Sequence, residues 1–153
     1  MQELVPFVQE NMILAIVWIG LVVAIIANVI KTSNAAYKEI TAAQTTHMIN
    51  RENGIVVDIR TKDEFKKGHI TDAVHILPSD IKANSFGSLE SHKADPIIVV
   101  CKTGQTAQES ANLLVKAGFE NVSVLKSGLV AWSEANLPLV KGKKEFKAKS
   151  KLT

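Results

Sequence analysis

Four short apolar runs, separated by segments with helical patterns, constrain the fold of this chain more than any other feature. A run such as 97–100 (IIVV) is apolar on both faces, as expected of a central strand in a parallel sheet. Strands that alternate with helices form a parallel sheet with helices on both faces. The sequence therefore predicts a three-layer α/β domain over residues 38–139, long enough for a single core. The four runs are residues 55–59 (IVVDI), 73–76 (AVHI), 97–100 (IIVV) and 122–125 (VSVL).

Helix signals fill the segments between these runs. Thr41 is in position to cap a helix that ends before Gly54. Thr61 and Glu64 have the spacing of a capping box, which opens a short helix ending at Gly68. After the third run, an apolar stripe at helical spacing predicts a helix that packs one face on the sheet and ends at Gly118. The stripe consists of Ala107, Ala111 and Leu114.

Residues 12–30 (MILAIVWIGLVVAIIANVI) contain no charged side chain. A helix of this length reaches about 28 Å, close to the hydrocarbon thickness of a bilayer. A buried core helix is the alternative, but such helices are usually shorter or have a polar face. The sequence therefore predicts one transmembrane helix at 12–30, between a short segment at 1–11 and a connector at 31–37.

A cleaved signal peptide would give a similar apolar run. Its first segment should be basic, whereas residues 1–11 hold Glu3 and Glu10 and no Lys or Arg, although SNAA at 33–36 resembles a cleavage site. Lys31 and Lys38 follow the run, and positive charge favours the cytoplasmic side. We therefore expect a single-pass protein of the bacterial inner membrane, with its amino terminus outside and its folded domain in the cytoplasm.

Charge and cysteine content exclude some classes of protein. Residues 140–153 hold six lysines and one glutamate, which predicts a basic flexible tail, and no nucleic-acid partner is expected. The chain has one cysteine and four scattered histidines, so neither an intramolecular disulfide nor a metal site is predicted. No cofactor is expected.

The single cysteine, Cys101, follows the predicted central strand directly and precedes a helix. Ligands bind at the carboxyl ends of the strands in open parallel sheets. A loop over residues 102–106 that curls around the sulfur would point several backbone N–H groups at it, and Gly104 permits such a curl. Those donors and the helix dipole would stabilise a thiolate, the reactive form of cysteine. A small buried cysteine beside a turn is the alternative.

The arrangement of residues around this loop resembles the rhodanese family of sulfurtransferases. The match runs over about residues 38–138, through VVDIRTKDEFKKGHITDAVHI and IIVVCKTGQTAQESANLLVKAGFENVSVLKSGLVAW. The resemblance implies a small α/β domain around a parallel sheet and a cysteine that carries sulfane sulfur. Together with the apolar run and the basic tail, it suggests the single-domain, membrane-anchored bacterial type. Features in family order are the Asp58/Arg60 pair, Phe65, Gly68-His69-Ile70, the cysteine loop, Gly118-Phe119, Gly128 and Trp132.

The resemblance also implies roles for individual residues. Cys101 matches the family nucleophile, and the residues after it match the cradle that holds the substrate or the persulfide. The form C-K-x-G-x-T is similar to the C-R-x-G-x-T of thiosulfate-using members, but many single-domain relatives have Arg or Lys at the place of Thr106, which leaves the donor open. Asp58, Arg60 and His69 are expected to support the structure. The cradle comprises Lys102, Thr103, Gly104, Gln105, Thr106 and Ala107.

The implied activity is transfer of sulfur from thiosulfate, or another sulfane donor, to a small-molecule or protein thiol through a Cys101 persulfide. A phosphatase of the related C-x5-R type would need an arginine where this chain has Ala107. The other alternative is a non-catalytic rhodanese module, tethered to the membrane, that binds other membrane proteins.

Overall fold

The computed structural model describes residues 11–33 and 36–142. The chain divides into two compact units, Met1–Ala35 and Ala36–Thr153. Apart from Asn11, the predicted amino-terminal segment 1–11 lies outside the described residues, as do residues 34–35 of the connector and 143–153 of the basic tail.

The second unit is built on a five-stranded sheet in the order β1-β5-β4-β2-β3. Every pair of neighbouring strands is parallel, which confirms the predicted α/β class with a parallel sheet. β4 lies between β5 and β2, so the IIVV run forms the central strand, as predicted. The strands are β1 (Lys38–Ile40), β2 (Ile55–Asp58), β3 (Val74–His75), β4 (Pro96–Val100) and β5 (Asn121–Leu125).

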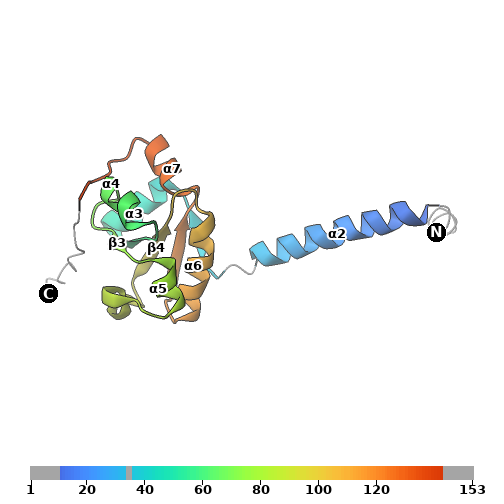
Figure 1. The fold of residues 1–153 in the computed structure, drawn as a ribbon, viewed down its shortest axis with the longest axis horizontal. Helices are drawn as coiled ribbons and strands as arrows, with labels where there is room; N and C mark the ends of the chain where they lie inside the picture. Colours follow the sequence, from blue (N-terminus) through green and yellow to red (C-terminus); the bar gives the residue numbers. More distant parts are fainter. Residues whose placement is uncertain (1–10, 34–35, 143–153) are drawn as a thin grey trace. The chain divides into compact units, whose positions relative to one another are not determined.

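Helices cover both faces of this sheet (Figure 1). Alternate residues of β4 divide between two cores: Ile97 and Val99 join one buried cluster, whereas Ile98 and Val100 join the other. The first core includes residues of α5 and α6, and the second includes residues of α3, α4 and α7. These elements are α3 (Ala42–Arg51), α4 (Lys62–Lys67), α5 (Pro78–Lys82), the 3₁₀ helix η1 (Gly87–His92), α6 (Gln105–Lys116) and α7 (Gly128–Glu134).

Local signals account for the helix boundaries. Thr41 caps α3 and Thr61 caps α4, each in a complete capping box, so both predicted caps are confirmed. Gly118 has φ +94°, the left-handed conformation that often follows the end of a helix and that glycine adopts readily. The predicted stripe of α6 is confirmed, because Ala107, Ala111 and Leu114 are all fully buried.

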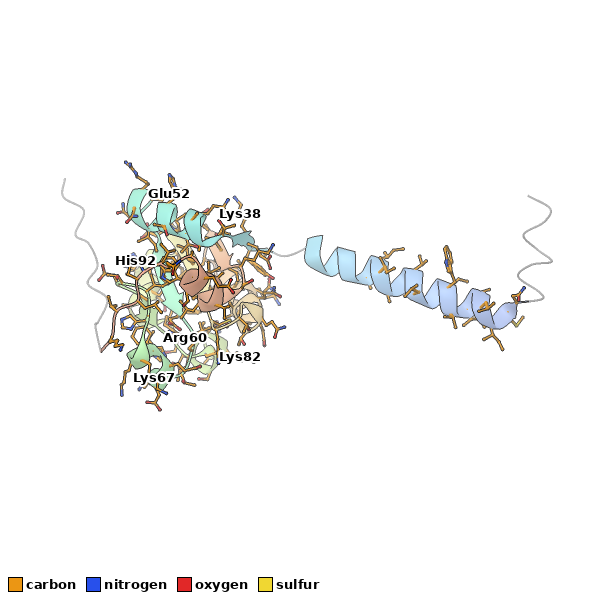
Figure 2. All side chains as sticks on the ribbon, turned by 90° about the horizontal axis from the view of Figure 1, so that it is seen from above. Lys38, Glu52, Arg60, Lys67, Lys82 and His92 are labelled. Carbon is orange, nitrogen blue, oxygen red and sulfur yellow. The ribbon has the colours of Figure 1, made fainter. Side chains whose placement is uncertain are left out.

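The sequence did not predict the edge strand β1. Its three residues contain a single buried side chain, that of Ile40, so it lacks the apolar run that marks the other strands. β1 forms because its backbone pairs with β5, with Lys38 opposite Ser123 and Ile40 opposite Leu125. Figure 2 shows Lys38 at the periphery of this unit, together with Glu52 and Lys67.

The first unit contains one helix, α2 (Met12–Ser33). Apart from Val22, its large apolar side chains between Met12 and Ile26 are each more than half exposed (Figure 2). Over the described ranges 11–33 and 36–142, no helix combines the length and the hydropathy needed to cross a membrane. The predicted transmembrane span at 12–30 is therefore helical but not confirmed as a span.

The buried stripe of α6 gives a test of the core. Leu114→Ala should lower the free energy of unfolding by about 2–5 kcal/mol, because it leaves a cavity beneath a fully buried side chain. Leu139→Ala, at a position 38% exposed, should cost about 1 kcal/mol or less. Urea titrations of the two variants measure both values, and equal losses would contradict the assignment of Leu114 to the core.

Candidate active site

Cys101 directly follows β4, at the carboxyl edge of the central strand. Its residue exposure is 5%, and it continues the alternation of Ile97 and Val99 into the core on the α6 side. The position agrees with the predicted one. Burial restricts contact between the sulfur and solvent, so the backbone around it decides which chemical form of the sulfur is stable.

One backbone donor reaches the sulfur. The N–H of Gly104 donates to Cys101 Sγ at 3.0 Å, and Gly104 adopts φ +92° at the start of α6. The sequence led us to expect several such donors, whereas Gly104 provides the one hydrogen bond to Sγ found among the described residues. An N–H group beside a sulfur stabilises its anionic form.

The start of α7 holds the other side of the loop. The N–H of Leu129 donates to the carbonyl oxygen of Cys101 at 2.9 Å, and the N–H of Val130 donates to that of Lys102 at 3.2 Å. These are first-turn N–H groups, which have no partner within their own helix. The contact joins residues that are far apart in sequence, and our sequence reasoning identified Gly128 only as a family position.

This contact fixes the direction of two peptide groups. In a trans peptide the carbonyl and the following N–H point in opposite directions, so the N–H groups of Lys102 and Thr103 point away from α7. Within the described part of the chain, neither N–H donates to a protein acceptor. Both are available to a bound oxyanion or to an anionic sulfur.

The side chains of the predicted cradle divide into two groups. Gly104 and Ala107 are buried, and Ala107 is part of the core of α6, so its methyl group packs inward and does not line the loop. Four side chains are exposed around the loop and are free to contact a substrate: Lys102, Thr103, Gln105 and Thr106.

Asp58, which is buried, and Arg60, which is partly buried, form an ion pair beside the loop. Asp58 ends β2 and lies opposite Val100, the residue before Cys101. The Arg60 Nη2 lies 2.6 Å from Asp58 Oδ2 and 2.7 Å from the carbonyl oxygen of Gly68. The guanidinium therefore joins the end of β2 to the end of α4.

His69 is fully buried, and its ring stacks on that of Phe65 with the ring centres 3.8 Å apart. Its Nδ1 lies 2.8 Å from the carbonyl oxygen of Phe65, so Nδ1 carries the hydrogen and donates. The backbone of His69 exchanges two hydrogen bonds with Val140. Among the described residues, no cluster of three His, Cys, Asp or Glu side chains is suited to a metal ion.

The start of α4 lies within electrostatic reach of the loop. Hydrogen bonds from the Thr61 side chain and backbone lower the pKa of Glu64, with smaller contributions from the positive charges of Arg60 and Lys102. Glu64 is thus ionised near neutral pH and partly balances the charge of Lys102.

Comparisons with known proteins show the family of the chain. Residues 41–135 match the model of the rhodanese-like domain, so the chain belongs to the rhodanese-like family. The fold of the family is the one described above.

Relatives of this chain fall into two groups. It is 49% identical over 143 residues to the uncharacterized protein YibN of Escherichia coli K12, covering 94% of this chain and 100% of YibN. It is 33% identical over 100 residues to the thiosulfate sulfurtransferase GlpE of Pseudoalteromonas translucida, covering 65% of this chain and 92% of GlpE. The solution structure of the rhodanese-like domain of Alr3790 from Anabaena sp. matches with a TM-score of 0.60 at 26% identity, over 75% of this chain and 93% of that domain.

The close contact between α7 and the loop predicts that a methyl group added to Gly128 destabilises the protein. A Cβ on Gly128 would lie 2.3 Å from the carbonyl oxygen of Cys101, and Gly128 has φ +57°. Gly87 has a similar φ, +53°, but open space around it. Gly87→Ala should therefore lower the free energy of unfolding by about 1–2 kcal/mol, for the left-handed backbone alone.

Gly128→Ala should lower the free energy of unfolding by the same ~1–2 kcal/mol for the left-handed backbone and by about 1–3 kcal/mol more for overpacking. It should also displace the loop. Urea unfolding measures the stability difference, and the rate at which iodoacetamide alkylates Cys101 measures the displacement. Equal stabilities and equal alkylation rates in the two variants would show that the contact is unimportant.

Proposed function

We propose that this protein is a sulfurtransferase that carries sulfane sulfur as a persulfide on Cys101. The observation that carries the proposal is the Gly104 N–H held 3.0 Å from Cys101 Sγ at the end of the central strand. The similarity to GlpE proteins, named thiosulfate sulfurtransferases, supports it. Thiosulfate, or a related sulfane compound, is the donor that we propose.

The chemistry needs two displacements. In the first, the Cys101 thiolate attacks the outer sulfur of thiosulfate; a sulfur–sulfur bond forms, the sulfur–sulfur bond of thiosulfate breaks, and sulfite leaves with the electron pair. In the second, an acceptor thiolate attacks the outer sulfur of the persulfide and regenerates the Cys101 thiolate. No general base is needed when both nucleophiles are already ionised.

The loop provides the electrostatic stabilisation for both steps. The N–H groups of Lys102 and Thr103, which donate to no acceptor in the described part of the chain, face away from α7 and are suited to negative charge on the donor or on the outer sulfur. The exposed Lys102 adds a positive charge that attracts an anionic donor. Because the chain has one cysteine, the acceptor must come from another molecule, either a small thiol or a protein.

The variant Cys101→Ser, which replaces the sulfur of the cysteine with oxygen, tests this proposal. The full chain should convert thiosulfate and cyanide to thiocyanate, and Cys101→Ser should reduce the rate to the uncatalysed background. After exposure to thiosulfate, the intact mass of the native chain should increase by one sulfur atom, and that of Cys101→Ser should not change.

A carrier that serves one acceptor protein would show the mass increase with slow turnover of cyanide. Absence of both the mass increase and the turnover would overturn the proposal. That result would favour the alternative of a non-catalytic module that binds other membrane proteins.

The location is part of the proposal. We infer that α2 attaches the protein to the bacterial inner membrane and that the rhodanese-like unit lies in the cytoplasm. The exposed apolar side chains between Met12 and Ile26 support the attachment, because a surface of this kind is unfavourable in water. Lys31 and Lys38 support the cytoplasmic side.

A charge in α2 tests the attachment. Leu21→Lys places an ammonium group in the apolar surface, at an expected cost of about 2.5–3.5 kcal/mol in a membrane, and should move protein from the membrane fraction to the supernatant. Leu139→Lys makes the same change at an exposed position of the other unit and should leave the distribution unchanged. If the native chain itself stays in the supernatant, the attachment is wrong.

A further inference from the structure

A hollow of about 200 Å³ lies behind the cysteine loop. One wall is the outer side of the loop at Thr103–Gln105, and another is the first turn of α6. The floor is the end of β5 at Val124 and Leu125, whose side chains are fully buried in the two cores on opposite faces of the sheet. Cys101 is not among the residues that line it, so the hollow is separate from the position where sulfur is held.

Opposite charges line this hollow. Glu39 pairs with Val124 in the parallel register of β1 and β5, and Lys126 follows Val124 by two residues. Because side chains alternate along a strand, this register places Glu39 on the face toward α6, and Lys126 lines the same hollow from the turn after β5. Neither side chain forms an ion pair with another described residue.

The carboxylate of Glu39 is held in position. The Gln108 side chain donates from Nε2 to Glu39 Oε1 at 3.0 Å, which joins β1 to α6 across the hollow. A carboxylate accepts several hydrogen bonds, so Glu39 can still accept from a ligand. The hydroxyl groups of Thr103 and Ser127 add donors and acceptors to the rim.

We propose that this hollow binds a free α-amino acid. The ammonium group of the ligand meets Glu39, its carboxylate meets Lys126, and its side chain faces the hydroxyl groups of Thr103 and Ser127. The volume corresponds to roughly seven waters, about the number of non-hydrogen atoms in a small amino acid. Exposed charges discriminate weakly, so the affinity is on the order of millimolar.

Occupancy of the hollow is transmitted to the cysteine. Gly104 lines the hollow, and its N–H is the group bonded to Cys101 Sγ. A ligand against this wall therefore changes the environment of the Gly104 amide. Binding itself depends on Glu39 and Lys126 and does not require sulfur transfer.

Serine is the probe for this site, because it has the size of cysteine without the reactive thiol. Titration of serine into the ¹⁵N-labelled full chain in detergent micelles should shift the amide resonance of Gly104 and saturate. Glu39→Gln and Lys126→Gln should each weaken binding about two- to fivefold, the contribution of one exposed ion pair. Lys116→Gln, which removes a charge at the other end of α6, should have no effect.

Two analogues test the need for both charges. Ethanolamine lacks the carboxylate and 3-hydroxypropionate lacks the ammonium group, and both should bind more weakly than serine. Equal shifts with the analogues, unchanged affinity in the Glu39→Gln/Lys126→Gln double variant, or no saturable shift at Gly104 would overturn the proposal. Cys101→Ser should abolish sulfur transfer and still bind serine, which separates this result from a failure of the proposed function.

Discussion

The contact between the start of α7 and the cysteine loop is the interaction on which the site depends. Leu129 and Val130 donate to the carbonyl oxygens of Cys101 and Lys102, and this direction of the carbonyls turns the following N–H groups the other way. A loop without these two bonds would be free to rotate its peptide groups. The donors that a negative charge needs would then have no fixed direction, and their stabilisation of that charge would be lost to reorganisation.

Much of the fold follows from patterns that are local in sequence. The capping boxes at Thr61 and Thr41 and the apolar stripe of α6 involve residues within one or two helical turns, and the central strand is a continuous apolar run. β1 lacks any such pattern. Its place depends on backbone bonds to β5, more than eighty residues further along the chain, and on the burial of Ile40 alone. Only the folded sheet supplies that partner.

In the candidate site, too, the features that follow from local sequence patterns were predicted, and those that depend on distant contacts were not. The position of Cys101 follows from the order of a buried strand and a helix, and Gly104 follows from the need for a positive φ. The number of donors at the sulfur did not follow, because it depends on how each peptide group is turned. That orientation comes from α7, and the sequence marks it only by a glycine, Gly128, at a place where a Cβ would meet the carbonyl oxygen of Cys101. The hollow between Glu39 and Lys126 depends on the pairing of β1 with β5. Because that pairing has no local sequence pattern, the sequence did not predict the hollow.

The backbone of the loop is therefore held on three sides, by the end of β4, by the start of α7 and by the first turn of α6. Its exposed side chains, among them Lys102, Thr103 and Thr106, have no part in these restraints. They can differ between members of the family without loss of the fold or of the geometry at the sulfur. Because a negative charge is stabilised by fixed N–H groups, the proposed function would draw the reactivity of Cys101 from the backbone and the choice of donor and acceptor from the side chains around it.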